Sequence, residues 1–149
     1  MNACCFFGHH DAPETIRPML GQAIRQMIVE HGVTLFYVGD SGSFDRMTAS
    51  VLRETKIAYP QIDFRIVLAY MPGKRDGLVE NQEIDTLLPD GIETVPRRFA
   101  ISFRNKWMVS KSDYVIAYIT HSFGGAAQFV ELAERQNKTV LNLADGQRH

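Results

Sequence analysis

Residues able to carry chemistry are concentrated in four short stretches of this 149-residue chain: "FFGHHDAPE", "FYVGDSGSFDR", "RNKWM" and "THSFGGAAQFVE". They supply glycines, short hydroxyl side chains, histidines, carboxylates and an arginine. Glycines allow a ligand to approach the backbone, and N–H groups at the start of a helix bind anions such as phosphate. These four stretches are therefore the candidate site.

The stretch "FYVGDSGSFDR" predicts a phosphate-binding turn between a strand and a helix. Asp45 falls in the first turn of that helix, where the helix dipole favours a carboxylate without any ligand. The same carboxylate could accept hydrogen bonds from a ribose or a base, and the sequence leaves both interpretations open. The glycine pattern does not match the dinucleotide fingerprint, which disfavours a dehydrogenase. The candidate binding residues in this stretch are Gly39, Asp40, Ser41, Gly42 and Asp45.

The stretch "FFGHHDAPE" follows the first apolar run. Gly8 permits close backbone approach, and we expect Asp11 to cap the next helix with Glu14 as its capping-box partner. His9 and His10 are expected on the exposed tip of the loop, where an imidazole can bind phosphate or act as acid or base. The alternative is a polar loop with incidental histidines. No tight His/Cys spacing is present, so we expect no metal.

The stretch "RNKWM" lies in a segment of helical period. Arg104 and Met108 are four apart and share a face, and Phe103 and Trp107 share the neighbouring, core-facing one. Arg104 and Asn105 either face solvent or direct their donors at a phosphate, and periodicity does not decide between these.

The stretch "THSFGGAAQFVE" ends in a carboxylate about two turns into a predicted helix. Ser122 is the expected helix cap, and Gly124 and Gly125 leave the helix start without bulk. Glu131 has two interpretations. It is either an exposed ion-pair partner of Arg135, four residues on, or a carboxylate overlooking the pocket at the glycine pair.

The elements that position these stretches alternate as in βαβ units. Most of the strand-like runs are apolar on both faces, which favours a parallel, doubly wound sheet of about five or six strands with helices on both sides. The stretches should then meet at the carboxyl ends of the strands. Residues 71–91 are the least regular segment, with a possible short helix near "NQEIDTLL", and form either a lid or a surface connection. The predicted strands are "ACCFF", "VTLFYV", "FRIVLAY", "IETV", "DYVIAYI" and "TVLNL".

Composition narrows the function classes further. The chain has 16 Lys+Arg against 17 Asp+Glu, and this net charge of -1 argues against a nucleic acid or an anionic membrane as partner. Cys4 and Cys5 are adjacent in an apolar run and are expected to be buried, reduced thiols. No apolar stretch approaches membrane-spanning length and no leader is evident, so we expect one cytoplasmic domain.

Taken in order, "FFGHHDAPE", "FYVGDSGSFDRM", "RNKWMVSKSDYVIAY" and "SFGGAAQFVELA" resemble the bacterial SLOG proteins across nearly the whole chain. This Rossmann-like superfamily takes its name from DNA-processing protein A and the lonely-guy (LOG) phosphoribohydrolases. The similarity is strongest to a small stand-alone bacterial group. The resemblance implies one Rossmann-like domain over residues 1–149, with a nucleotide or nucleotide-derived ligand along the strand ends.

The LOG enzymes carry RKxxM and PGGxGTxxE motifs and hydrolyse the N-glycosidic bond of a nucleoside monophosphate. In the first motif Arg104 and Met108 match, and Asn105 stands at the lysine. The residues that match the second motif are Gly124, Gly125 and Glu131. The residues that depart from it, at the proline, glycine and threonine, are Phe123, Ala127 and Gln128.

By this resemblance the expected catalytic residues are Glu131, which would stabilise an oxocarbenium-like ribose or activate water, and Arg104, which would orient phosphate or sugar. We expect the chain to bind a nucleotide-derived small molecule, with N-glycoside hydrolysis as the most concrete enzymatic form and no cofactor. The alternative is a non-catalytic sensor or regulatory module. A nucleic-acid-binding role ranks third, and the family suggests a homodimer.

Overall fold

The computed structural model describes residues 2–70 and 85–147, which contain a six-stranded parallel sheet in the order β4-β3-β2-β1-β5-β6. Every neighbouring pair is parallel. This confirms the predicted doubly wound, Rossmann-like α/β fold. The strands are β1 (Asn2–Gly8), β2 (Val33–Val38), β3 (Asp63–Val67), β4 (Thr86–Leu87), β5 (Tyr114–Tyr118) and β6 (Thr139–Asn142).

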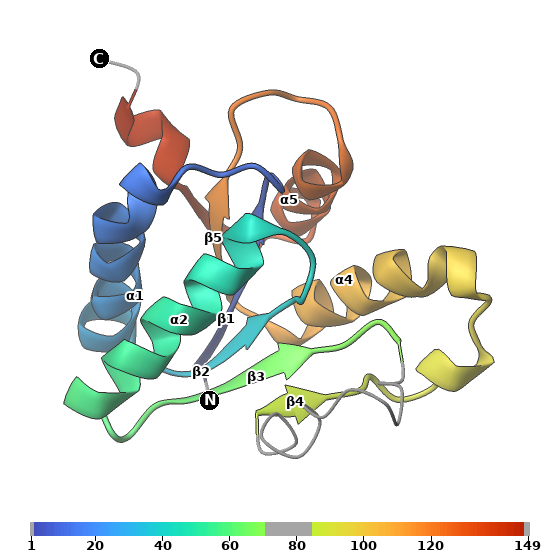
Figure 1. The fold of residues 1–149 in the computed structure, drawn as a ribbon, viewed down its shortest axis with the longest axis horizontal. Helices are drawn as coiled ribbons and strands as arrows, with labels where there is room; N and C mark the ends of the chain where they lie inside the picture. Colours follow the sequence, from blue (N-terminus) through green and yellow to red (C-terminus); the bar gives the residue numbers. More distant parts are fainter. Residues whose placement is uncertain (1, 71–84, 148–149) are drawn as a thin grey trace.

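Helices cover both faces of this sheet (Figure 1). α1 (Arg17–His31) and α2 (Ser43–Ala58) pack on one face, and α4 (Ala100–Lys111) and α5 (Gly125–Arg135) pack on the other. Short 3-10 helices complete the described elements: η1 (Glu14–Ile16), η2 (Ile92–Thr94), η3 (Arg97–Phe99) and η4 (Leu143–Gln147). The strand order reverses between β1 and β5, and ligands of open α/β sheets bind beyond the strand ends at such a reversal.

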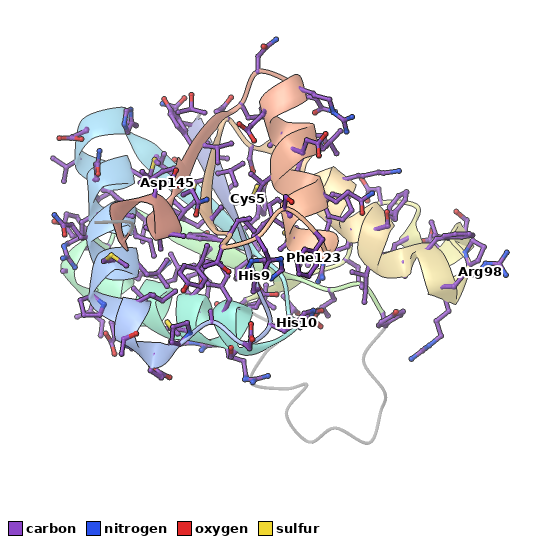
Figure 2. All side chains as sticks on the ribbon, turned by 90° about the horizontal axis from the view of Figure 1, so that it is seen from above. Cys5, His9, His10, Arg98, Phe123 and Asp145 are labelled. Carbon is purple, nitrogen blue, oxygen red and sulfur yellow. The ribbon has the colours of Figure 1, made fainter. Side chains whose placement is uncertain are left out.

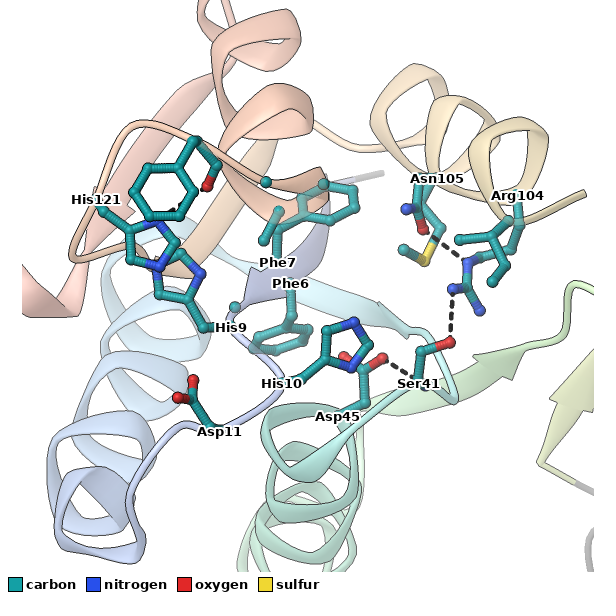
Figure 3. Close-up of a pocket in the computed structure, with 17 residues that line it drawn as sticks. Phe6, Phe7, His9, His10, Asp11, Ser41, Asp45, Arg104, Asn105 and His121 are labelled. Carbon is teal, nitrogen blue, oxygen red and sulfur yellow. Dashed lines mark hydrogen bonds between the residues drawn. The ribbon is translucent and has the colours of Figure 1, made fainter. Parts of the chain in front are cut away.

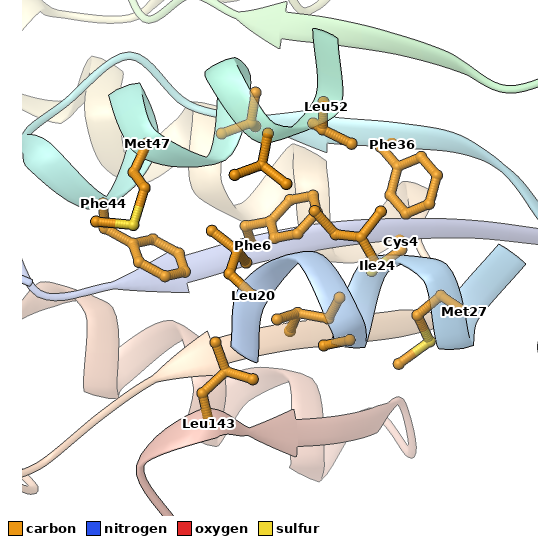
Figure 4. Packing of buried hydrophobic residues seen from close by; sticks show 14 of the residues in the cluster. Cys4, Phe6, Leu20, Ile24, Met27, Phe36, Phe44, Met47, Leu52 and Leu143 are labelled. Carbon is orange, nitrogen blue, oxygen red and sulfur yellow. The ribbon is translucent and has the colours of Figure 1, made fainter. Parts of the chain in front are cut away.

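The central strand β1 is buried on both faces because successive side chains point to opposite sides of a sheet. Cys4 and Phe6 pack with α1 and α2, whereas Cys5 and Phe7 pack with α4 and α5 (Figure 4 shows the first layer). Both thiols are free and buried, as predicted. Burial raises the pKa of Cys5 to about 12, so the thiol stays protonated and unreactive.

One predicted strand is wrong. The run "IETV" forms η2 (Ile92–Thr94) and not a strand. Gly91 precedes it with a left-handed φ of 84°, and the Thr94 hydroxyl donates a 2.7 Å hydrogen bond to the Gly91 carbonyl, closing a local turn. The strand in this part of the chain is β4, within the end of the predicted "NQEIDTLL" helix. Residues 71–84, which carry most of the predicted lid, lie outside the described residues.

The predicted helix caps are also wrong. α1 follows η1 with Ile16 at its N-cap, so Asp11 caps neither element. α5 is preceded by Gly124 at its N-cap and α2 by Gly42, and neither helix has a side-chain cap. The two glycines share a backbone conformation, φ 96° and ψ 180° at Gly42 and φ 98° and ψ 171° at Gly124, that is essentially restricted to glycine. The chain therefore enters both helices by the same tight turn.

Candidate functional site

A pocket of about 330 Å³ opens where β1 and β5 end, at the reversal of strand order (Figure 3). Its walls come from all four stretches singled out in the sequence. It is therefore the one place where the fold brings those stretches together among the described residues. The predicted site residues that line it are Gly8, His9, His10, Ser41, Asp45, Arg104, Asn105, Met108, Gly124 and Gly125.

Arg104 forms one wall of the pocket from α4 and is 2% exposed. Its Nη1 donates to Asp40 Oδ1 at 2.8 Å and to the Val67 carbonyl at 2.9 Å. Its Nε donates to Asn105 Oδ1 at 2.7 Å, and its Nη2 donates to Ser41 Oγ at 3.3 Å. The solvent-facing interpretation of Arg104 is therefore wrong, and its expected role toward a phosphate or sugar stays a prediction. The guanidinium ties the end of β3 and the turn after β2 to α4.

Asp45 supplies a carboxylate to the pocket from the first turn of α2. Its Oδ2 accepts a 2.9 Å hydrogen bond from the Ser41 N–H. Burial raises the pKa of Asp45 to about 6, against the opposing effects of that hydrogen bond and of Arg104. Near neutral pH this half-buried side chain is thus a hydrogen-bonding group close to its titration point.

Glycine is required at two positions of this wall. A Cβ on Gly39 would lie 2.9 Å from Asp45 Oδ2 and 3.0 Å from the Arg104 guanidinium. A Cβ on Gly42 would lie 2.5 Å from His10 Nδ1, and the φ of Gly42 is itself unfavourable for other residues. Gly39, Asp40 and Gly42 are not pocket-lining residues, and they act by shaping and holding the wall.

The two histidines of the first stretch differ, and the prediction that both occupy an exposed tip is wrong for His9. His9 is 8% exposed, and its Nε2 accepts a 3.0 Å hydrogen bond from the Thr120 N–H. Burial, followed by the neighbouring His121, lowers the pKa of His9. His9 is therefore a neutral crosslink between the turns after β1 and β5. His10 is exposed and lines the pocket.

Two aromatic residues of the pocket were not among the predicted site residues. The His121 ring stacks on His9 at a centroid distance of 3.8 Å, and Phe123 stacks on His121 at 3.9 Å. Figure 2 shows Phe123 beside His9 and His10 in the view from above. Nothing in the periodicity of the sequence marks them, and the only available signal was the position of Phe123 next to the glycine pair.

Glu131 and Ser122 are not brought into the pocket. Glu131 is exposed on α5, whose buried residues include Phe129, Val130 and Ala133, and it is not a pocket-lining residue. Within the described residues it forms no ion pair with Arg135. Ser122 is exposed and does not line the pocket either. The catalytic role of Glu131 stays a prediction, and Asp45 is the pocket carboxylate that α2 provides.

Two further findings concern residues 2–70 and 85–147. No group of three or more His, Cys, Asp or Glu residues in these ranges is placed to hold a metal ion. None of their helices is long and apolar enough to cross a membrane.

No protein-family model and no curated protein matches the sequence. The fold is similar to the X-ray structure of DNA processing protein A (DprA) from Streptococcus pneumoniae, with a TM-score of 0.69 and 13% sequence identity. The similarity covers 94% of this chain and 49% of that one, so the chain spans about half the length of its neighbour. The comparison shows a shared α/β fold. Membership of the SLOG superfamily, of which DprA is a member, stays a prediction from the motifs.

Proposed function

We propose that the pocket between the ends of β1 and β5 binds a nucleotide-derived small molecule. The observation that carries this proposal is the convergence of three strand-to-helix turns and one face of α4 on one pocket at the strand-order reversal. A pocket of about 330 Å³ is within the usual size range of small-molecule sites.

The phosphate of such a ligand is expected at the start of α5. Gly124 and Gly125 line the pocket, no side chain caps this helix, and a Cβ on Gly125 would meet nothing within 4 Å. Free N–H groups and the positive end of the helix dipole favour an anion there. Arg104 supports the pocket wall, since its Nε, Nη1 and Nη2 each donate to a protein acceptor.

The sugar is expected near Asp45 and His10, which both line the pocket. An ionised Asp45 accepts hydrogen bonds from ribose hydroxyls, and an exposed imidazole can donate or accept. These groups lie on the wall formed by β1 and α2, across the pocket from the glycine pair of α5 (Figure 3 shows His10 and Asp45).

N-glycoside hydrolysis is the finer form of the proposal and needs a carboxylate beside the anomeric carbon. Asp45 reaches the pocket, whereas Glu131 is exposed outside its lining. Asp11 also lines the pocket but is exposed, so enzymatic turnover is expected to depend first on the less exposed Asp45. Without turnover, the same pocket serves a ligand sensor or regulatory module.

A nucleic-acid-binding role is the second candidate, favoured by one surface feature. Residues 97–111 contain five basic and no acidic side chains. Four of the basic side chains are exposed: Arg97, Arg98, Lys106 and Lys111. The structural neighbour DprA is by its name a DNA-processing protein. The net charge of -1 argues against this candidate.

The test measures thermal stabilisation by nucleoside monophosphates, NAD, ADP-ribose and single-stranded DNA, followed by assay of each binder for release of free base. Gly125→Glu should abolish nucleotide stabilisation by repelling phosphate without loss of fold, because an acidic residue suits a helix start. Gly125→Gln is the matched neutral control and should retain binding. Stabilisation by DNA alone, or none by any nucleotide, would contradict the proposal.

Base release is assayed in Asp45→Asn and Glu131→Gln. Loss in the first and retention in the second assigns the chemistry to Asp45, and the reverse assigns it to Glu131. Binding without release by the unaltered chain at high concentration leaves the sensor function.

A further inference from the structure

Three rings form a continuous stack at the rim of the pocket. His121 stacks on His9 with an interplanar angle of 14°, and Phe123 stacks on His121 with an angle of 20°. Both neighbours lie within 4 Å of the His121 centroid, so they must occupy its opposite faces. Phe123 is therefore the outer end of the stack.

The outer end of this stack is open to solvent. Phe123 is 71% exposed, although it belongs to a ring stack and lines the pocket. Within the described residues, no ring other than His121 stacks on it. An exposed phenyl ring at the rim of a pocket leaves an apolar face available to a ligand that carries a flat group.

The platform is also held in position before any ligand arrives. His121 Nδ1 donates a 2.9 Å hydrogen bond to the carbonyl of Phe123, which can only accept. His9, at the inner end, is buried and fixed by the Thr120 N–H. Ordering a side chain on binding costs free energy, and a ring that is already stacked loses less freedom.

We propose that the outer face of Phe123 is the base-stacking platform of the nucleotide site. The ligand places its heteroaromatic base on Phe123 and its sugar phosphate in the pocket beside Gly124, Gly125 and Asp45. Stacking recognises the face of a base and not its hydrogen-bonding edge, so the site accepts purine and pyrimidine ligands alike. This inference rests on the proposed nucleotide function and assigns a part of it to one residue.

The experiment is a calorimetric titration of the full chain with adenosine monophosphate, cytidine monophosphate and ribose 5-phosphate. Phe123→Ala should weaken the binding of both nucleotides by about 5- to 150-fold. The affinity for ribose 5-phosphate should change by less than about twofold. Phe123→Trp should retain nucleotide affinity because it preserves a flat ring. Ile57→Ala, which alters another exposed apolar side chain on α2, is the control and should change neither.

The outcomes separate this inference from the proposed function. Nucleotide binding that is unchanged in Phe123→Ala, or is weakened as much as ribose 5-phosphate binding, overturns the stacking platform and leaves the nucleotide site. Equal affinity of the unaltered chain for ribose 5-phosphate and for the nucleotides also overturns the stacking platform and leaves the nucleotide site. Failure of the unaltered chain to bind any of the three ligands overturns the proposed function and the platform with it.

Discussion

The turn into α2, taken as residues 39–45, and the turn into α5, taken as residues 120–125, begin their helices in the same way but are stabilised differently. Each contains an N-cap glycine with extended ψ, Gly42 with φ 96° and Gly124 with φ 98°, at the same edge of the sheet. The turn before α2 is held by polar contacts to the buried Arg104. The turn before α5 is largely exposed, and its rings, His121 and Phe123, stack face to face. The same backbone turn thus provides a fixed wall on one side of the pocket and an open, exposed wall on the other.

Burial explains this difference. A buried guanidinium must find acceptors, so Arg104 organises the residues around it. The exposed rings of the second turn cost little free energy of desolvation. They therefore need no network of hydrogen bonds like the one around Arg104. If this comparison holds, substitutions in the first turn affect mainly stability, and substitutions in the second affect mainly binding.

The largest effect is expected for Arg104→Ala. Removing the guanidinium leaves Asp40 and the Val67 carbonyl without this donor and opens a cavity, so the free energy of unfolding should fall by about 2–5 kcal/mol. Urea unfolding measures the change. Lys106→Ala, exposed on the same helix, should stay within about 0.5 kcal/mol. Similar values for the two variants would show that the wall does not depend on Arg104.

A smaller effect is expected from matched glycine substitutions in the two turns. Gly39→Ala forces a methyl group against Asp45 and Arg104 and should destabilise by about 1–3 kcal/mol. Gly125→Ala meets open space and should be neutral or slightly stabilising. Thermal unfolding measures the stability of both variants. Equal losses of stability would show that the two turns do not differ in how tightly they are packed.

The effect expected for Asp45→Asn differs from the others because it depends on pH. The unfolded chain ionises this group near its ordinary pKa of 3.8, whereas the folded chain does so near 6. The ionisation of Asp45 therefore lowers the free energy of unfolding. This loss is absent below about pH 4, grows as pH rises to 6, and is complete above 6. The asparagine variant should be more stable by about 1–3 kcal/mol at pH 7.5 and unchanged at pH 4.

Urea unfolding at several pH values follows this difference. Asp90→Asn replaces an exposed carboxylate and should show no comparable trend. A gain in the Asp45 variant that is independent of pH would show that the cost does not arise from ionisation.

The sequence was sufficient for the fold because the strands are apolar on both faces, as at Cys4 to Phe7, and this pattern has few other structural solutions. The sequence was misleading where short-range backbone geometry determined the local secondary structure. "IETV" has strand-forming residues, yet the left-handed Gly91 and the Thr94 hydroxyl close a turn. The two-residue β4 is too short to leave a periodic signal.

The candidate site could be predicted as a set of turns, since the carboxyl ends of parallel strands share one edge. The direction of individual side chains could not. His9 is covered by the His121 ring and hydrogen-bonded by the Thr120 N–H, and both partners lie far along the chain. Glu131 has suitable motif spacing, but the face of α5 that packs on the sheet leaves it exposed.

The adjacent thiols of β1 provide a separate probe for each half of the molecule. Cys4 lies beneath α1 and α2, and Cys5 lies beneath α4 and α5. A thiol reagent can reach each sulfur only when the layer above it opens, so the labelling rate of each cysteine reports the local opening of one layer. The unaltered chain thus carries two internal reporters, one residue apart, for asking which helical layer detaches first.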